Sequence, residues 1–177
     1  MRLFIAINFE KETKNKLLSL RDELQSVSLR GNFSLPENIH LTLVFLGECD
    51  AKQTYAVKTA MDMVFFEPFE MEIERLGRFK RDDGDLWWVG MRESKPLLDL
   101  QRDLTDLLGQ YVKGVTIDKR KYSPHITLGR KVAADTNPRQ IESFGETVNR
   151  IDLMKSERIN GKLTYTAIYG KNGGKTR

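Results

Sequence analysis

The chain contains two histidines, and each is followed two residues later by a threonine. The pairs are His40 with Thr42 and His125 with Thr127. Both pairs lie in apolar runs, HLTL and HITL, that predict β-strands. Side chains two residues apart on a strand point to the same face, so each histidine is expected to share a face with its threonine. Each motif would therefore present an imidazole and a hydroxyl together, while its apolar residues anchor the strand.

Two imidazoles and two hydroxyls that meet in one place suit the opening of a cyclic phosphodiester. That reaction needs a base to take a proton from water and an acid to protonate the departing alkoxide. Histidines, whose ordinary pKa is about 6.5, can divide these roles at neutral pH. Threonine hydroxyls can donate hydrogen bonds to the non-bridging phosphate oxygens. We expect no cofactor and no metal, since the sequence has no HxH, HExxH or Cys/His cluster.

The alternative interpretation is that both are strand histidines satisfied by ordinary hydrogen bonds. Threonine makes up only 12 of the 177 residues, so its presence two residues after both histidines is unusual for that composition. Strands are enriched in threonine, which weakens this argument. The equal placement of the motifs in two similar halves of the chain strengthens it.

Length and composition indicate one soluble globular domain, with 177 residues, 40% apolar and 31% charged. No apolar run approaches the ~18 residues of a membrane span, and residues 1–8 are too short for a signal peptide. We therefore expect a cytoplasmic monomer with no membrane partner. The single cysteine, Cys49, suits a reducing compartment and is interpreted as a structural thiol, not a nucleophile. The net charge of +4 permits a polyanionic ligand without requiring one.

Hydrophobic patterning predicts the elements that must position the motifs. The first half is predicted to contain a buried strand over 2–7, a helix over 10–27, a loop, a strand over 40–46, a helix over 51–66 and a strand over 69–75. The second half is predicted to contain a strand over 86–91, a helix over 96–108, a loop over 109–121 with a short strand, a strand over 125–129, a helix over about 138–147, and strands over 149–157 and 163–169. An Asn-Gly turn at 160–161 joins the last two strands as a hairpin.

The two halves repeat the same order of elements. Phe4 lies 36 residues before His40, and Val89 lies 36 residues before His125. This repeat predicts an α+β fold built as a bilobal pseudo-twofold duplication, with two antiparallel-rich sheets flanked by helices and a central groove between the HxTx strands. We expect a single domain over residues 1–170, with lobes of about 1–80 and 85–170 that can exchange strands. Residues 171–177 are expected to form a flexible tail.

Three segments of the chain carry a resemblance to a known family: RLFIAI at the N-terminus, PENIHLTLVFLGE at 36–48 and YSPHITLGR at 122–130. They resemble the two-histidine (2H) phosphoesterase superfamily, and within it the RNA 2′,3′-cyclic phosphodiesterases, also called 2′-5′ RNA ligases. The resemblance covers nearly the whole chain. The double HxTx is specific for the superfamily, and the FLGE and PHxTLxR extensions favour its RNA-acting branch.

The resemblance implies a hydrolase that opens RNA 2′,3′-cyclic phosphate ends, such as those of tRNA fragments, to 2′-phosphomonoesters. The reverse reaction would form a 2′-5′ linkage. The resemblance also implies that His40 is the proton donor to the leaving ribose oxygen and that His125 is the proton acceptor. Thr42 and Thr127 would hold the phosphate. The residues themselves leave acid and base unassigned, since the two motifs are nearly alike.

Arg130 closes the second motif, and its guanidinium would suit a phosphate oxygen. It lies five residues after His125, so in an unbroken strand it would face away from that imidazole. Contact with the phosphate therefore requires Gly129 to bend the chain. The alternative for Arg130 is a solvated charge at the end of the strand.

Three further residues are candidates for contact with the substrate. Tyr122 and Lys121 belong to the basic run before the second motif, which could stack on a base and meet the RNA backbone or be only a solvated loop. Phe33 stands in a region where relatives often carry a tryptophan, and it could replace that ring. Of the adjacent Trp87 and Trp88, at most one can serve as a stacking platform.

Two other functions stay open. One is a 2H enzyme that acts on a small nucleotide, such as a cyclic phosphate of ADP-ribose or a 2′-5′ oligoadenylate. The other is a non-catalytic RNA-binding module that only holds phosphates. The presence of both histidines and both threonines argues against such a module, and the modest net charge argues against tight nonspecific binding of RNA.

Overall fold

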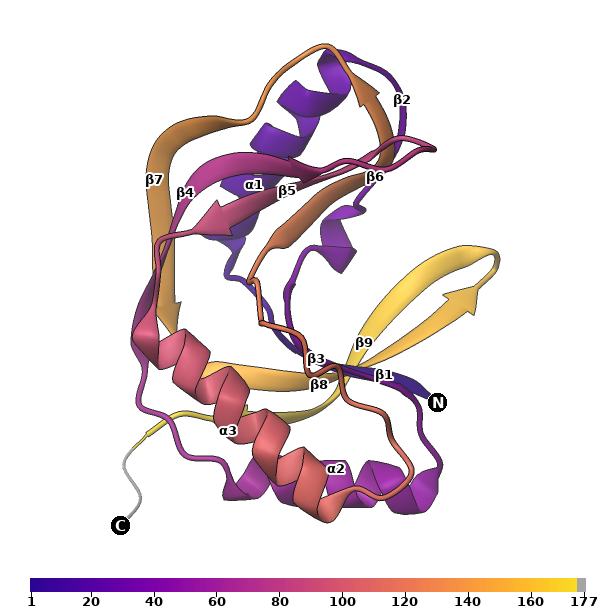
Figure 1. Ribbon diagram of the computed structural model, residues 1–177, viewed down its shortest axis with the longest axis vertical. Helices are drawn as coiled ribbons and strands as arrows, with labels where there is room; N and C mark the ends of the chain where they lie inside the picture. The colour runs from indigo at the N-terminus through magenta and orange to yellow at the C-terminus, as the bar shows by residue number, and fades with distance from the viewer. Residues whose placement is uncertain (175–177) are drawn as a thin grey trace.

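The computed structural model describes residues 1–174, which form two antiparallel sheets and three α-helices (Figure 1). The elements in chain order are β1 (Arg2–Ile7), α1 (Lys11–Ser26), β2 (Ser28–Phe33), the 3₁₀-helix η1 (Pro36–Asn38), β3 (Leu41–Glu48), α2 (Ala51–Met63), β4 (Phe69–Phe79), β5 (Asp85–Met91), α3 (Lys95–Tyr111), β6 (Ile126–Ala134), β7 (Arg139–Val148), β8 (Arg150–Ile159) and β9 (Lys162–Asn172). His40 and His125 immediately precede β3 and β6.

The order of the strands repeats between the sheets. The first sheet runs β3-β1-β8-β9, and the second runs β2-β6-β5-β4-β7, so β6-β5-β4-β7 matches the whole first sheet strand for strand. Each HxTx strand thus pairs with the first strand of its own half, β3 with β1 and β6 with β5. This arrangement confirms the predicted α+β fold with two antiparallel sheets and an internal duplication.

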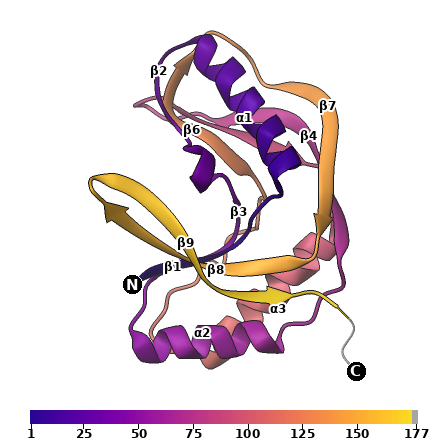
Figure 2. The same ribbon diagram turned by 180° about the vertical axis from the view of Figure 1, so that it is seen from behind.

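The two sheets do not coincide with the two halves of the chain. β8 and β9 come from the second half and complete the sheet of β1 and β3. β4 comes from the first half and lies between β5 and β7. The helices also cross over: α1 packs against β2, β6 and β7, whereas α3 packs against α2 and β3 (Figures 1 and 2). Each lobe therefore contains segments from both halves.

The helices follow the rules of local sequence. Asp50 caps α2 by accepting a hydrogen bond from Gln53 N at 2.7 Å, and Gln53 Oε1 accepts one in return from Asp50 N at 2.9 Å. The face of α3 that carries the predicted leucines is buried, with Leu97, Leu100 and Leu104 at most 1% exposed. None of the helices in residues 1–174 is long and apolar enough to span a bilayer.

The helix predicted over about 138–147 is wrong, because this segment is the edge strand β7. Ile141 and Phe144 lie three residues apart, which suggests a helical stripe, and both pack against the core. In a strand, a bulge can also place two side chains three residues apart on one face. Opposite β4, Phe144 pairs with Ile73 and Gln140 pairs with Arg75, so four residues of spacing on β7 face two on β4. The extra residues turn both apolar side chains to one side.

The loop predicted between the first helix and the first motif contains a strand, β2. Its sequence SLRGNF lacks alternation, and Leu29 is 95% exposed. The backbone of β2 pairs with the free edge of β6, where Asn32 lies opposite Arg130 and Phe33 opposite Gly129. The pairing depends on this edge and not on side-chain pattern. The short strand expected within 109–121 is absent, since α3 continues to Tyr111 and no strand forms in the rest of that segment.

The predicted Asn-Gly turn is confirmed. Asn160 and Gly161 both have positive φ, at 51° and 78°, as a two-residue turn between twisted strands requires. The β8–β9 hairpin projects from the body of the protein (Figure 1). Asn38 Nδ2 donates to the Leu163 carbonyl at 2.9 Å and fastens the hairpin to η1. β9 continues to Asn172, and the rest of the predicted tail beyond residue 174 lies outside the described residues.

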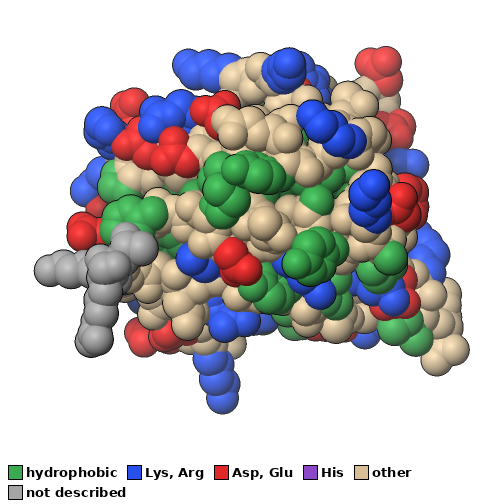
Figure 3. Space-filling model, turned by 90° about the horizontal axis from the view of Figure 1, so that it is seen from below, with side chains coloured by type: hydrophobic (Ala, Val, Ile, Leu, Met, Phe, Trp, Pro, Cys, Tyr) green, Lys and Arg blue, Asp and Glu red, His purple; other side chains and the backbone are tan. Residues whose placement is uncertain are grey.

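Most of the core lies between sheets and helices, and Cys49 belongs to it at 3% exposure. Burial raises the pKa of the Cys49 thiol, which supports a structural role for this residue. Figure 3 shows the end of the molecule that carries α2 and α3. Apolar side chains are scattered there among charged ones, and neither histidine is visible. The polar faces of the two motifs look instead toward the space between the sheets.

Candidate active site

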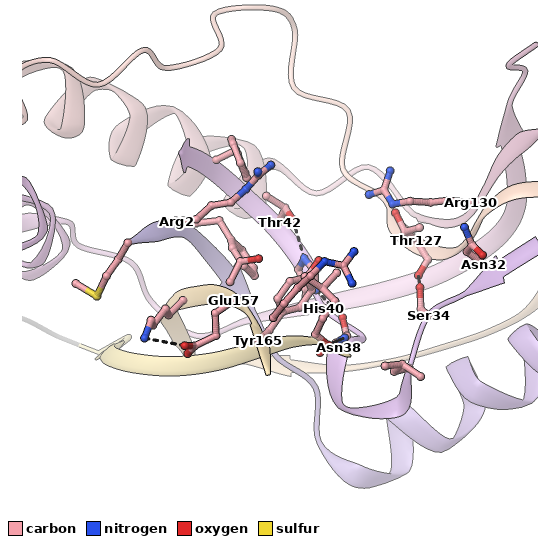
Figure 4. A pocket seen from close by; sticks show the side chains of 18 of the residues that line it. Arg2, Asn32, Ser34, Asn38, His40, Thr42, Thr127, Arg130, Glu157 and Tyr165 are labelled. Carbon is pink, nitrogen blue, oxygen red and sulfur yellow. Dashed lines mark hydrogen bonds and ion pairs between the residues drawn. The ribbon is translucent and has the colours of Figure 1, made fainter. Parts of the chain in front are cut away.

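The four motif residues line one groove between the two sheets. Its volume is about 1100 Å³, and His40, Thr42, His125, Thr127 and Arg130 all lie in its walls. Figure 4 shows the two threonines, from different sheets, facing this common space. The convergence of the two motifs was predicted from the repeat, and the groove is where they meet.

The histidines are held in the same way. His40 Nδ1 lies 2.7 Å from the Asn38 carbonyl oxygen, and His125 Nδ1 lies 2.8 Å from the Ser123 carbonyl oxygen. A carbonyl oxygen only accepts hydrogen bonds, so Nδ1 must carry a proton in both rings. Nε2 is therefore the nitrogen that can gain or lose a proton. The equal carbonyl contact, two residues before each histidine, fixes the same tautomer in both motifs.

The two threonines differ in the free protein. Thr42 Oγ1 lies 2.9 Å from His40 Nε2 and can donate to the neutral ring. Within residues 1–174, the Thr127 hydroxyl makes no hydrogen bond, and it is open to the groove. Thr127 can thus receive an anion without giving up a partner, whereas Thr42 must turn away from His40.

Each imidazole packs against two aromatic rings. The distances between ring centroids are 4.9 Å from His40 to Phe4, 5.2 Å from His40 to Tyr165, 5.4 Å from His125 to Phe79 and 6.3 Å from His125 to Trp88. Trp87 faces the core and is fully buried, so the predicted division of the two tryptophans is found. Trp88 is not a free platform, because it supports His125.

Burial lowers the pKa of His40, and the positive charges of Arg130 and His125 lower it further. The Asn38 carbonyl opposes this shift by stabilising the protonated ring. The net effect favours neutral His40 in the free protein.

We predict that an NMR titration will show this lowered pKa directly. The chain has two histidines, so a single His125→Asn variant assigns both imidazole signals. His40 should titrate below the ordinary value of about 6.5. Addition of inorganic phosphate should move its midpoint upward, since a nearby anion stabilises the imidazolium. A midpoint of His40 at or above the ordinary value would contradict the effect of burial.

Arg130 reaches the groove because of a β-bulge. Trp88 pairs with Thr127, but the next residue, Trp87, pairs with Gly129, so Leu128 is an extra residue in β6. The alternation of faces resets at this point. Arg130 therefore lies on the same face as Thr127, although its spacing from His125 is odd. The predicted bend near Gly129 is present.

The first motif contains the same bulge. Ala6 pairs with Thr42 and Ile5 pairs with Val44, so Leu43 is the extra residue in β3. Phe45 consequently lies on the groove side and lines the groove. Phe45 and Arg130 are thus equivalent positions of the two lobes.

The outer edge of each HxTx strand is held by a residue from the segment before the other motif. The Ser34 hydroxyl donates to the Thr127 carbonyl at 2.8 Å, and the Tyr122 hydroxyl donates to the Thr42 carbonyl at 2.7 Å. Burial raises the pKa of Tyr122. Each half of the chain thereby positions the threonine of the other half.

This contact changes the interpretation of the remaining candidates. Tyr122 packs against the core and does not line the groove, so its ring is not a platform for a base. Lys121 is exposed on the preceding loop and also lies outside the groove lining. Phe33 does line the groove. Sequence reasoning missed Ser34 and Tyr165, because neither belongs to a motif; only the strand pairing places them.

Comparison with known proteins gives a consistent result. The sequence model of the 2′-5′ RNA ligase superfamily matches residues 9–160. An RNA 2′,3′-cyclic phosphodiesterase of Archaeoglobus fulgidus is 31% identical over 170 residues, which cover 92% of this chain and 94% of that protein. An Escherichia coli protein of the same name is 27% identical over 94% of this chain and 93% of its own length.

The fold is also found in solved structures. A crystal structure of E. coli LigT complexed with 3′-AMP has a TM-score of 0.85 and 24% identity, over 98% of both chains. The predicted resemblance to the 2H phosphoesterases and the prediction of a hydrolase are both confirmed by these relatives. The chain belongs to the 2′-5′ RNA ligase superfamily.

Proposed function

We propose that this protein hydrolyses 2′,3′-cyclic phosphate ends of RNA to 2′-phosphomonoesters. The observation that supports this most is the set of groups in one groove: two imidazoles with the same tautomer, two threonine hydroxyls and a guanidinium. The named activity of the relatives agrees with it. A 2′,3′-cyclic phosphate requires a ribose 2′-oxygen, so this reaction excludes DNA ends, and the names of the relatives favour RNA ends over small nucleotides.

The proposed reaction uses one histidine on each side of the phosphorus. His125 Nε2 takes a proton from water as the water oxygen bonds to phosphorus. The bond from phosphorus to O3′ breaks, and protonated His40 gives its Nε2 proton to O3′. The phosphate stays on O2′. A 5′-hydroxyl in place of water would give a 2′-5′ linkage by the same steps.

The charge on the phosphate is held by other residues. Thr42 and Thr127 donate hydrogen bonds to the non-bridging oxygens, and Arg130 adds a charge-assisted contact. These groups supply both proton transfers and the stabilisation of charge, so the proposed mechanism is independent of metal and cofactor. Assignment of His40 as the donor follows the family resemblance.

The lowered pKa of His40 must be reconciled with the role of donor. Neutral His40 is favoured in the free protein. A phosphate bound between the threonines brings negative charge next to this ring, which favours the imidazolium. Substrate binding would therefore favour protonation of His40 Nε2. Thr42 Oγ1 would at the same time exchange its hydrogen bond with His40 for one with the phosphate.

The ring of Phe33 is the proposed contact for the terminal base. It lies over two glycines, and a Cβ on Gly31 would be 2.9 Å from this ring and one on Gly129 would be 3.1 Å from it. The glycines thus leave the space that the ring occupies. Phe33 pairs with Gly129 and the neighbouring pair is Asn32 with Arg130, and both Phe33 and Arg130 line the groove, so the base of a cyclic phosphate held by Arg130 is proposed to reach this ring.

A direct test uses an oligoribonucleotide that ends in a 2′,3′-cyclic phosphate, with EDTA in the buffer. We expect turnover to a single product, the 2′-phosphomonoester, identified by ³¹P NMR. The same oligonucleotide with a 3′-phosphate is the control and should stay unchanged. Lack of turnover, a requirement for added metal, or a 3′-phosphate product would each contradict the proposal.

A further inference from the structure

The groove extends past the catalytic residues to an aromatic side chain that the reaction does not use. Phe45 lines the groove and is 47% exposed. The bulge at Leu43 turns it outward, since Leu43 and Val44 both point into the core. The bulge in the backbone therefore directs the Phe45 ring into the groove.

A free guanidinium accompanies the ring. Arg2 Cζ lies 5.1 Å from the centroid of Phe45, within the range of a cation–π contact. Arg2 also lines the groove, and within residues 1–174 it forms no ion pair. The two carboxylates at this end already have cationic partners: Glu157 lies 3.0 Å from Lys155 Nζ, and Glu48 lies 3.4 Å from the amino terminus. Arg2 thus has its charge available for an anion.

Each end of the groove has one arginine and one phenylalanine in its lining. Arg130 and Phe33 both line the groove at the β2–β6 side, and Arg2 and Phe45 lie beside each other at the other end. Figure 4 shows Arg2 beyond Thr42 and Arg130 beyond Thr127, so the arginines lie on opposite sides of the proposed phosphate position. A guanidinium and an aromatic ring together suit one nucleotide, because the cation binds its phosphate and the ring stacks on its base.

We propose that Phe45 and Arg2 form a subsite for the penultimate nucleotide of the RNA end. The inference rests on the proposed function, which places the cyclic phosphate between the histidines. The phosphodiester that precedes the terminal nucleoside then contacts Arg2, and the penultimate base stacks on Phe45. The groove volume of about 1100 Å³ exceeds the ~300–1,000 Å³ usual for a drug-sized ligand, so it has room for more than one nucleoside. Any base can stack, so this subsite senses chain length and not sequence.

The test compares two substrates, a nucleoside 2′,3′-cyclic phosphate and a trinucleotide that ends in one. We expect the trinucleotide to have the higher kcat/KM in the native protein. Phe45→Ala should lower kcat/KM for the trinucleotide by about tenfold and change it less than twofold for the mononucleotide. Phe45→Trp should retain the preference, because the larger ring still stacks. Arg2→Gln should also act on the trinucleotide alone and should weaken its dependence on salt.

Two matched controls separate the subsite from general effects. Phe65→Ala removes a phenylalanine of nearly equal exposure, 49%, that does not line the groove. Arg102→Gln removes the same charge from the exposed surface of α3. Neither should change the ratio of the two kcat/KM values.

The outcomes keep this inference distinct from the proposed function. Equal loss on both substrates in Phe45→Ala, or a native protein that shows no preference for the trinucleotide, would overturn the subsite while hydrolysis itself stands. Failure to hydrolyse either substrate would instead overturn the proposed function. A selective loss with Phe45→Ala that Phe45→Trp restores would support the subsite.

Discussion

Replacement of either histidine by alanine is expected to lower kcat on a cyclic phosphate end by about 10²–10⁴-fold, the usual contribution of a positioned acid or base. His40→Ala removes the proposed donor to O3′, and His125→Ala removes the proposed acceptor from water. KM should change much less, because Thr127 and Arg130 still hold the phosphate. The measurement is steady-state hydrolysis of the oligonucleotide, with the unfolding midpoint of each variant recorded beside it.

The double variant adds a sharper test. Both histidines act in one step, so His40→Ala with His125→Ala should be about as slow as the slower single variant and not slower by the product of both losses. Phe65→Ala serves as the folded control. If either single variant retains more than about a tenth of native kcat, well above the loss expected for a general acid or base, the two-histidine mechanism is wrong.

Arg130→Gln is expected to lower kcat/KM by about 10- to 100-fold, since it removes a charge-assisted contact to the phosphate. It should also change the pH profile. The positive charge of Arg130 contributes to the lowered pKa of His40, so its removal raises that pKa. Arg130→Lys keeps the charge but loses the planar fork, so it should lower kcat/KM without the same change in pH profile.

The pH profile tests the electrostatic link between Arg130 and His40. Because kcat/KM reports the free protein, Arg130→Gln should move the limb that follows His40 to higher pH. A profile identical to that of the native protein would contradict this link. The two apparent pKa values belong to the coupled pair of imidazoles, so the comparison between variants carries the information.

The sequence predicted the parts of the site that follow strand periodicity. His40 and Thr42 share a face because they are two residues apart, and the same holds for His125 and Thr127. Arg130 could be placed only conditionally, because the bulge at Leu128 is a property of the pairing with β5. Phe45 belongs to the FLGE extension of the first motif but was not predicted as a site residue, since its equivalence to Arg130 appears only when both bulges are known.

Other errors have the same origin in tertiary contacts. Apolar side chains at 141 and 144 fit a helix by spacing, but the open edge of β4 and a bulge make the segment a strand. The sequence of β2 has no strand pattern, and the free edge of β6 determines its conformation. The aromatic ring of Tyr122 could stack on a base, but in the structure it packs against the core, and its hydroxyl donates a hydrogen bond to the Thr42 carbonyl of β3.

The exchange of contacts between the two halves of the chain has a consequence for folding. Ser34 holds the edge of β6, Tyr122 holds the edge of β3, and β8 comes from the opposite half of the chain to its partner β1. Neither half can complete its own sheet before the other is made, so the many pairings distant in sequence must form together. Acid and base are thus assembled in one cooperative event, and a partly folded chain holds neither in working position.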